Sequence, residues 1–128
     1  MSKAECFEDL RIWQEARQLV KQIYVDLEKV KDYGFRDQIQ RAAISIMNNI
    51  AEGFERNSDA DFARFLNIAK GSAGEVRSMF YSAEDLGYVG EQIAADRRGV
   101  AKTISKGIGT LETYLRKWPL TLDLQTLD

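Results

Sequence analysis

Apolar residues recur every three or four positions along most of the chain, with polar and charged residues between them. This spacing is typical of amphipathic α-helices that bury one face. The first such stretch covers about residues 8–32. Asp32-Tyr33-Gly34 is predicted to close it, because glycine tolerates the left-handed conformation that ends helices. Its apolar stripe is formed by Phe7, Leu10, Trp13, Ala16, Val20, Ile23, Leu27 and Val30.

Three more stretches of the same kind follow. The second begins after Gly34 and is interrupted at residues 56–59, where Ser58 or Asp59 can cap a third helix by accepting its free N–H groups. The third ends at residues 86–90. The fourth runs from about Gly90 to Trp118. The stripes are Ile39, Ala43, Ile46, Met47, Ile50 and Phe54; Phe62, Phe65, Ala69, Ala73, Val76, Phe80 and Ala83; and Ile93, Val100, Ile104, Ile108, Leu111 and Leu115.

Long helices joined by short links pack as antiparallel neighbours. We therefore predict an all-α protein, an antiparallel up-and-down four-helix bundle of residues 1–118. Pro119 stops the last helix because it has no N–H to donate. Residues 119–128 form a C-terminal tail with alternating apolar and polar positions, which either lies extended against a surface or is frayed.

Composition excludes several kinds of chemistry. The 128 residues contain no histidine and one cysteine, Cys6, so the chain lacks a His-based triad, a Cys/His zinc site and an intrachain disulfide. No glutamate has the E-x-x-H spacing of a di-iron bundle. We expect a protein that is not an enzyme and uses no cofactor or metal. No apolar run approaches the roughly 18 residues of a membrane span, and the charged first residues do not suit a signal peptide, so we expect a cytoplasmic protein without membrane contact.

One face of the second helix carries polar residues within about 100° of one another. Two alternatives stay open for this face: ordinary solvation, or contact with a partner helix or ligand. Adjacent asparagines favour contact slightly, because asparagine is a middling helix former. The predicted partner is the third helix of the same or an adjacent subunit. The residues predicted to meet are Arg41, Ser45, Asn49 and Glu52 on the second helix and Ser72 and Glu75 on the third.

The third helix also contains Gly71 and Gly74, and each mid-helix glycine costs about 1 kcal/mol relative to alanine. Either another helix approaches closely there, or a long, well-packed helix tolerates them.

The fourth helix has a stretch of basic residues without an acid between Asp96 and Glu112. Such a stripe is either solvated or paired with nearby acids, or it contacts phosphates, which require only positive charge within reach. The candidate nucleic-acid-binding residues are Arg97, Arg98, Lys102 and Lys106. The 18 basic and 20 acidic residues of the whole chain give a net charge of −2.

The second and third helices carry distinctive local sequences, residues 40–53 (QRAAISIMNNIAEG), Phe65-Leu66 and residues 68–72 (IAKGS). With residues 7–10 (FEDL) and Leu86-Gly87-Tyr88, they resemble the bacterial four-helix bundle family encoded in intervening sequences of the 23S ribosomal RNA gene. The likeness covers about residues 7–116. It implies an up-and-down bundle that assembles as a homopentamer.

That family is similar to the accessory variability protein of diversity-generating retroelements, a strongly basic pentamer that binds nucleic acid. The present chain departs from it with a pI of about 5.3. Apolar residues that widen the apolar surface beyond a narrow seam also predict a homo-oligomer; these are Trp13, Tyr24, Ile44, Met79 and Tyr81. We expect an accessory protein that contacts RNA or DNA through repeated basic stripes or, as the alternative, a protein-binding scaffold without nucleic-acid affinity.

Overall fold

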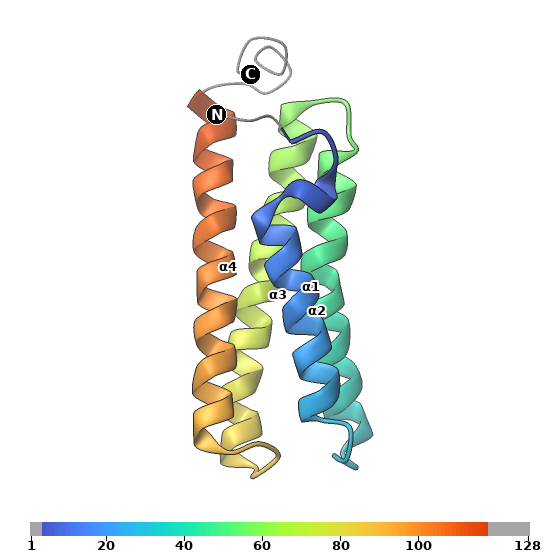
Figure 1. Cartoon of the computed structure of the whole chain (residues 1–128), viewed down its shortest axis with the longest axis vertical. Coiled ribbons are helices and arrows are strands. Elements are labelled where there is room, and N and C mark those ends of the chain that lie inside the picture. The colour runs from blue at the N-terminus through green and yellow to red at the C-terminus, as the bar shows by residue number, and fades with distance from the viewer. Residues whose placement is uncertain (1–3, 118–128) are drawn as a thin grey trace.

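A computed structural model describes residues 4–117, which form four α-helices and one short 3-10 helix and contain no strand. The helices run alternately up and down side by side, as Figure 1 shows. This arrangement confirms the predicted all-α fold. The predicted tail at residues 119–128 lies outside the described residues. The elements are η1 (Phe7–Asp9), α1 (Arg11–Asp26), α2 (Tyr33–Phe54), α3 (Asp59–Asp85) and α4 (Glu91–Lys117).

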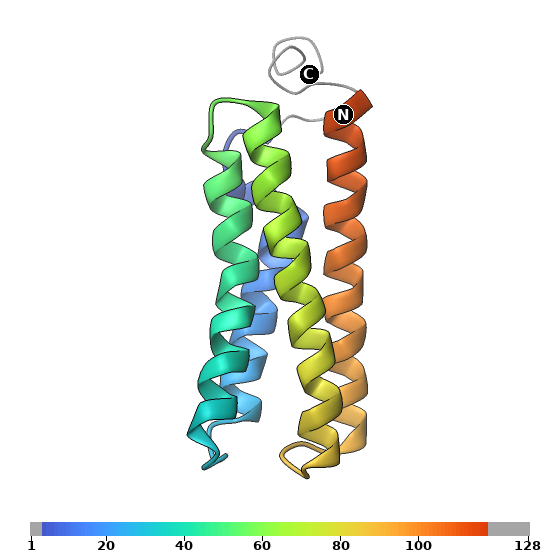
Figure 2. The same ribbon diagram turned by 180° about the vertical axis from the view of Figure 1, so that it is seen from behind.

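The bundle is held together by one apolar face of each helix. The described residues that are buried as a whole are apolar or glycine, and Leu19, Ile46, Phe80 and Ile104 are fully buried representatives of the four helices. Removing these faces from water is the main stabilising contribution to such a fold. Helices that follow each other in sequence pack extensively, whereas α1 and α4 pack less closely. Figure 2 shows α3 between α2 and α4 from behind.

Helix α1 is shorter than the sequence predicts. It ends at Asp26, and the chain then turns. Leu27 is nevertheless fully buried, and Val30 packs against the core from the turn. The guanidinium of Arg36 donates hydrogen bonds to the carbonyl oxygens of Glu28 and Val30, both at 3.3 Å. The apolar spacing therefore continues past the helix end, because this turn presents its apolar side chains to the same core.

Asp32 begins α2 and does not close α1, so the predicted role of Asp32-Tyr33-Gly34 is wrong. Its Oδ1 accepts a hydrogen bond from the backbone N–H of Phe35 at 3.2 Å, as an N-cap residue does. Its Oδ2 accepts one from the hydroxyl of Tyr88 at 2.6 Å, which joins the two loops at this end of the bundle. The Tyr88 hydroxyl and the Phe35 N–H lower the pKa of Asp32, since both stabilise the carboxylate.

The predicted start and end of the third helix lie where expected. The Oγ of Ser58, one of the two predicted caps, accepts a hydrogen bond from the N–H of Asp61 at 3.1 Å. Gly87, with φ +73°, ends α3. The N–H of Tyr88 donates to the carbonyl oxygen of Ala83 at 2.8 Å, and the N–H of Gly87 donates to that of Glu84 at 3.0 Å. This pair of bonds is the Schellman motif, which requires a left-handed residue at the position of Gly87.

Helices α2 and α3 approach each other closely at Gly53. A Cβ atom there would lie 2.8 Å from the Cβ of Phe65 and 3.3 Å from the carbonyl oxygen of Phe62. Gly71 and Gly74 differ, since no atom of the described chain lies within 4 Å of the position a Cβ would take. Close approach within the subunit therefore explains the glycine at position 53. For Gly71 and Gly74 two explanations stay open: a long helix tolerates them, or another molecule packs against them.

We expect Gly53→Ala to lower the free energy of unfolding by about 1–3 kcal/mol, the usual cost of overpacking. The added methyl group would collide with the α3 backbone, which cannot rotate away as a side-chain tip can. Gly99→Ala is the matched control, because its methyl group meets open space; it should raise stability by about 0.5–1 kcal/mol. Urea denaturation of both variants measures the difference, and equal stabilities would contradict the close approach.

Candidate functional site

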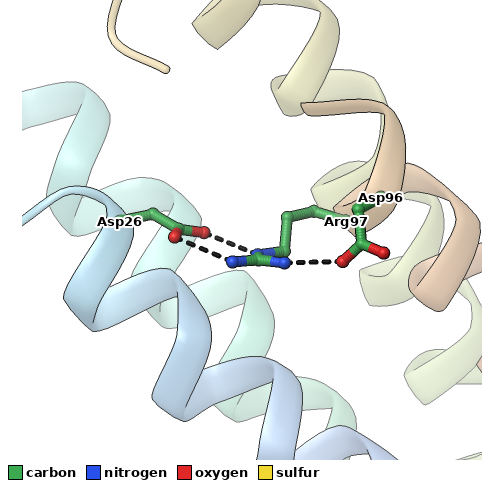
Figure 3. A network of polar contacts seen from close by, with 3 residues as sticks. All are labelled: Asp26, Asp96 and Arg97. Atoms are coloured by element: carbon green, nitrogen blue, oxygen red, sulfur yellow. Dashed lines mark hydrogen bonds and ion pairs between the residues drawn. The ribbon is translucent and has the colours of Figure 1, made fainter. Parts of the chain in front are cut away.

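The basic stripe predicted on α4 begins with Arg97, whose guanidinium group is paired with acids of the same subunit. Its Nε and Nη2 donate to the two carboxylate oxygens of Asp26 on α1 at 2.7 and 2.9 Å. Its Nη1 donates to Asp96 at 2.6 Å, and Figure 3 shows the guanidinium between the two acids. The side chains of Arg97 and Asp26 are only 14% and 5% exposed. The hydrogen bonds to Asp26 raise the pKa of Arg97 above its usual value.

Arg98 is engaged with α3. Its Nη1 lies 2.9 Å from Oε1 of Glu84 and donates to the carbonyl oxygen of Phe80 at 3.3 Å. Its guanidinium carbon lies 4.1 Å from the ring centroid of Tyr81, a cation–π contact. The side chain is 16% exposed. Arg98, like Arg97, therefore joins α4 to a neighbouring helix and offers little charge to a ligand.

Lys102 and Lys106 lie further along α4 and are different. Both are exposed, and neither forms an ion pair with any residue in the range 4–117. They stand four residues apart and so point to the same side of the helix. The predicted stripe is thus divided: its first two residues bind acids within the subunit, and its last two face solvent.

The polar stripe of α2 lies partly against α3. The hydroxyl oxygens of Ser45 and Ser72 are 2.9 Å apart and joined by a hydrogen bond. The amide Nδ2 of Asn49 donates to the backbone oxygen of Ser45 at 2.8 Å and to its hydroxyl at 2.9 Å. Glu75 accepts a hydrogen bond from Nε2 of Gln38 at 3.1 Å. The structure therefore brings Ser45, Asn49 and Ser72 together in one half-buried chain of hydrogen bonds.

Two predicted members of this stripe lie outside that chain. Glu52 is exposed and forms an ion pair with Arg56 on its own helix at 3.0 Å. Arg41 is exposed and lines an open groove of about 580 Å³ between α2 and α3, together with Ser45, Ser72 and Glu75. The groove holds charges of both signs. The Ser45–Ser72 and Gln38–Glu75 hydrogen bonds fasten α2 to α3.

The described residues contain no group of three or more Asp, Glu or Cys side chains placed to hold a metal ion. Partial burial and then the neighbouring acids Asp9 and Glu8 raise the pKa of the Cys6 thiol, so the reactive thiolate is disfavoured. Among residues 4–117, none of the helices combines the length and apolar character that crossing a bilayer requires.

Sequence reasoning missed the acids that engage the basic stripe. Asp26 is 71 positions from Arg97 in the sequence, and Glu84 is 14 positions from Arg98. The local pattern of α4 shows an acid-free stretch and carries no signal for acids on other helices. Only the packing of α4 against α1 and α3 reveals the pairs.

Fold and surface together define a small helical bundle in which several charged residues fasten the helices to one another and whose described part has no group of acids placed to hold a metal ion. The chain belongs to the 23S rRNA-intervening sequence protein family, whose model matches residues 8–110. No curated protein sequence matches the chain.

A solved structure has the same fold. It is a protein of unknown function from the S23 ribosomal protein family of Bacteroides thetaiotaomicron VPI-5482, with a TM-score of 0.74 and 24% sequence identity. The match covers 79% of this chain and 97% of that one.

We expect Arg97→Met to lower the free energy of unfolding by about 3–5 kcal/mol, because it leaves the buried carboxylate of Asp26 without its cation. The exposed Lys102→Met is the control and should change stability by less than about 0.5 kcal/mol. Adding Asp26→Leu to Arg97→Met should recover most of the loss, since a buried ion pair replaced by apolar residues is often neutral. Denaturant unfolding of the three variants measures this, and a loss below about 1 kcal/mol for Arg97→Met would contradict it.

Proposed function

We propose that the protein is a homo-oligomeric accessory protein that contacts the phosphates of RNA or DNA without reading the bases. One observation carries this proposal: Lys102 and Lys106 stand exposed on one side of α4, without an acid partner within residues 4–117. Phosphate contacts need positive charge at the surface and no special geometry.

Two lysines per subunit bind phosphate weakly by themselves. An assembly that repeats them raises the effective concentration of each further contact once the first is made. Arg97 and Arg98 support this surface indirectly, because their ion pairs fix α4 against α1 and α3.

Exposed apolar side chains support self-assembly. All the exposed large apolar side chains of the described residues except Ile68 lie toward the end of the bundle that carries the α1–α2 and α3–α4 loops (Figure 1). Exposed apolar surface concentrated in this way marks an interaction site. These side chains are Tyr24, Val25, Tyr33, Tyr81, Leu86 and Ile93. We propose a homopentamer, the form that the family resemblance implies.

The alternative is a protein-binding scaffold without nucleic-acid affinity. The net charge of −2 and the internal pairing of Arg97 and Arg98 favour it, since both reduce the positive charge available to phosphate. The same apolar end would then receive a different protein.

We expect the parent protein to shift a labelled RNA or DNA in a gel at low salt, with little sequence preference and with an affinity that falls steeply as salt is added. Lys102→Gln with Lys106→Gln should weaken the shift strongly, while circular dichroism and oligomer mass stay unchanged. If the parent shifts neither nucleic acid, the scaffold function replaces this proposal.

Light scattering at micromolar concentration is expected to give a mass several times 14.6 kDa, with five subunits favoured. Tyr24→Ser with Val25→Ser should reduce this mass, because it removes apolar surface from the loop end. The matched control Ile68→Ser removes an exposed apolar side chain away from that end and should leave the mass unchanged. A monomer mass for the parent would refute self-assembly.

A further inference from the structure

A groove of about 650 Å³ between α3 and α4 contains Lys106 and two further cations. Lys70 of α3 lines it together with Lys106 and Arg116 of α4. The remaining lining is polar or small, and includes Asn67, Thr110 and Thr113. No large apolar side chain lines this groove.

The groove is lined by more cations than acids. Glu112 is the one acid that lines it, against three cations. Its Oε1 lies 3.9 Å from Nζ of Lys70, a long ion pair, and its side chain is 14% exposed. The side chain of Lys70 is 51% exposed, so its ammonium group remains accessible to an anion. The lining therefore has an excess of two positive charges in a chain whose net charge is −2.

The alignment of α3 with α4 along their length shows that further cations lie along the same seam. Arg98 meets Glu84 near the loop end of the seam between the two helices. Lys70 meets Glu112 near the other end. Arg77 lies halfway between Lys70 and Glu84 along α3, and seven residues from Lys70 it points to the same side of the helix. Arg77 is exposed, and it is therefore level with the middle of α4.

The exposed Lys102 and Lys106 occupy that level of α4. Arg77 and these two lysines place positive charge on both sides of the same seam. Arg98 at the other end of this seam is compensated by Glu84, whereas Arg77, Lys102 and Lys106 are exposed cations that an anion can approach from solvent.

We propose that this α3–α4 groove receives the phosphodiester backbone of a nucleic-acid strand, with Lys70 and Arg116 as phosphate contacts in addition to Lys106. This inference rests on the proposed function and places it on a surface that includes α3. The α4 lining from Lys106 to Arg116 extends over about 15 Å of helix axis, which is the axial length of about four phosphates of one duplex strand. The site is thus elongated, as the backbone is, and larger than a single phosphate ion requires.

The lining favours nucleic acid over an acidic protein segment. Protein partners are usually held by buried aromatic or apolar anchors, and the groove offers none. Phosphate oxygens accept hydrogen bonds from lysine, arginine, threonine and asparagine side chains, the kinds that the groove presents. No base-reading arrangement accompanies them, so binding should be insensitive to sequence.

The test compares two charge-matched double variants of the full chain. The groove variant is Lys70→Gln with Arg116→Gln. The control is Lys29→Gln with Lys31→Gln, which removes the same charge from two exposed lysines of the α1–α2 loop, at the opposite end of the bundle. Circular dichroism and thermal melts verify that both fold. A third variant, Lys70→Arg with Arg116→Lys, keeps the charge and should bind as the parent does.

The measurement is the salt dependence of the dissociation constant for a labelled 20-nucleotide single-stranded RNA of mixed sequence. Loss of two phosphate contacts should reduce the slope of log K against log salt by at least about 1.4. The control should retain the slope of the parent.

If the parent binds and the groove variant keeps its slope, the α3–α4 groove is not the binding surface and the proposed function stands. If the parent does not bind, the proposed function fails and this inference fails with it. If poly-glutamate of equal charge displaces the RNA as well as unlabelled RNA does, the groove accepts acidic polymers in general and its assignment to nucleic acid is overturned.

Discussion

The ion pair between Arg97 and Asp26 is the contact on which the closed bundle depends. Helices α1 and α4 pack side by side although no loop connects them directly, and they pack less closely than helices that follow each other in sequence. A bidentate pair in a nearly dry position fixes both their distance and their rotation, because the guanidinium fork matches one carboxylate geometry. An unpaired Asp26 would be a buried charge, so openings of this seam are strongly disfavoured. The core supplies most of the stabilising free energy, and this pair decides which faces of α1 and α4 meet.

The same pairs determine where positive charge is left on the surface. At the loop end of α4, acids on three helices compensate the cations: Asp26, Glu84 and Asp96. Toward the C-terminal end of α4, Lys102, Lys106 and Arg116 find a single nearby acid, Glu112. The chain can therefore have an acidic overall composition and still carry a positive groove, because cations outnumber acids in the lining of that groove. Net charge describes the whole molecule and does not limit one face of it.

Sequence reasoning predicts the parts of this protein that local physics determines. Apolar spacing located four helices, and the chemistry of Ser58 and Gly87 located the start and the end of α3. It failed at Leu27 and Val30, which keep the helical spacing while lying in a turn, since periodicity records burial and not backbone conformation. For the candidate site, it found Lys102 and Lys106 but not Lys70, which joins them only when α3 and α4 are set side by side. It also included Arg97 and Arg98, because Asp26 and Glu84 lie on other helices; the third acid, Asp96, is next to Arg97 in the sequence.

Among residues 4–117, the residues that are buried as a whole are apolar or glycine, and the polar groups available to a partner lie at the surface. Two features of the surface stand out: exposed apolar side chains toward the end with the α1–α2 and α3–α4 loops, and the positive α3–α4 groove toward the other end. Because these features are separated along the bundle axis, a contact made at one end leaves the other accessible. Subunits that associate through their loop ends would thus present several grooves at once, and each bound phosphate would favour the next. Weak individual contacts then add up to useful affinity, which a single positive groove on an acidic chain would not provide.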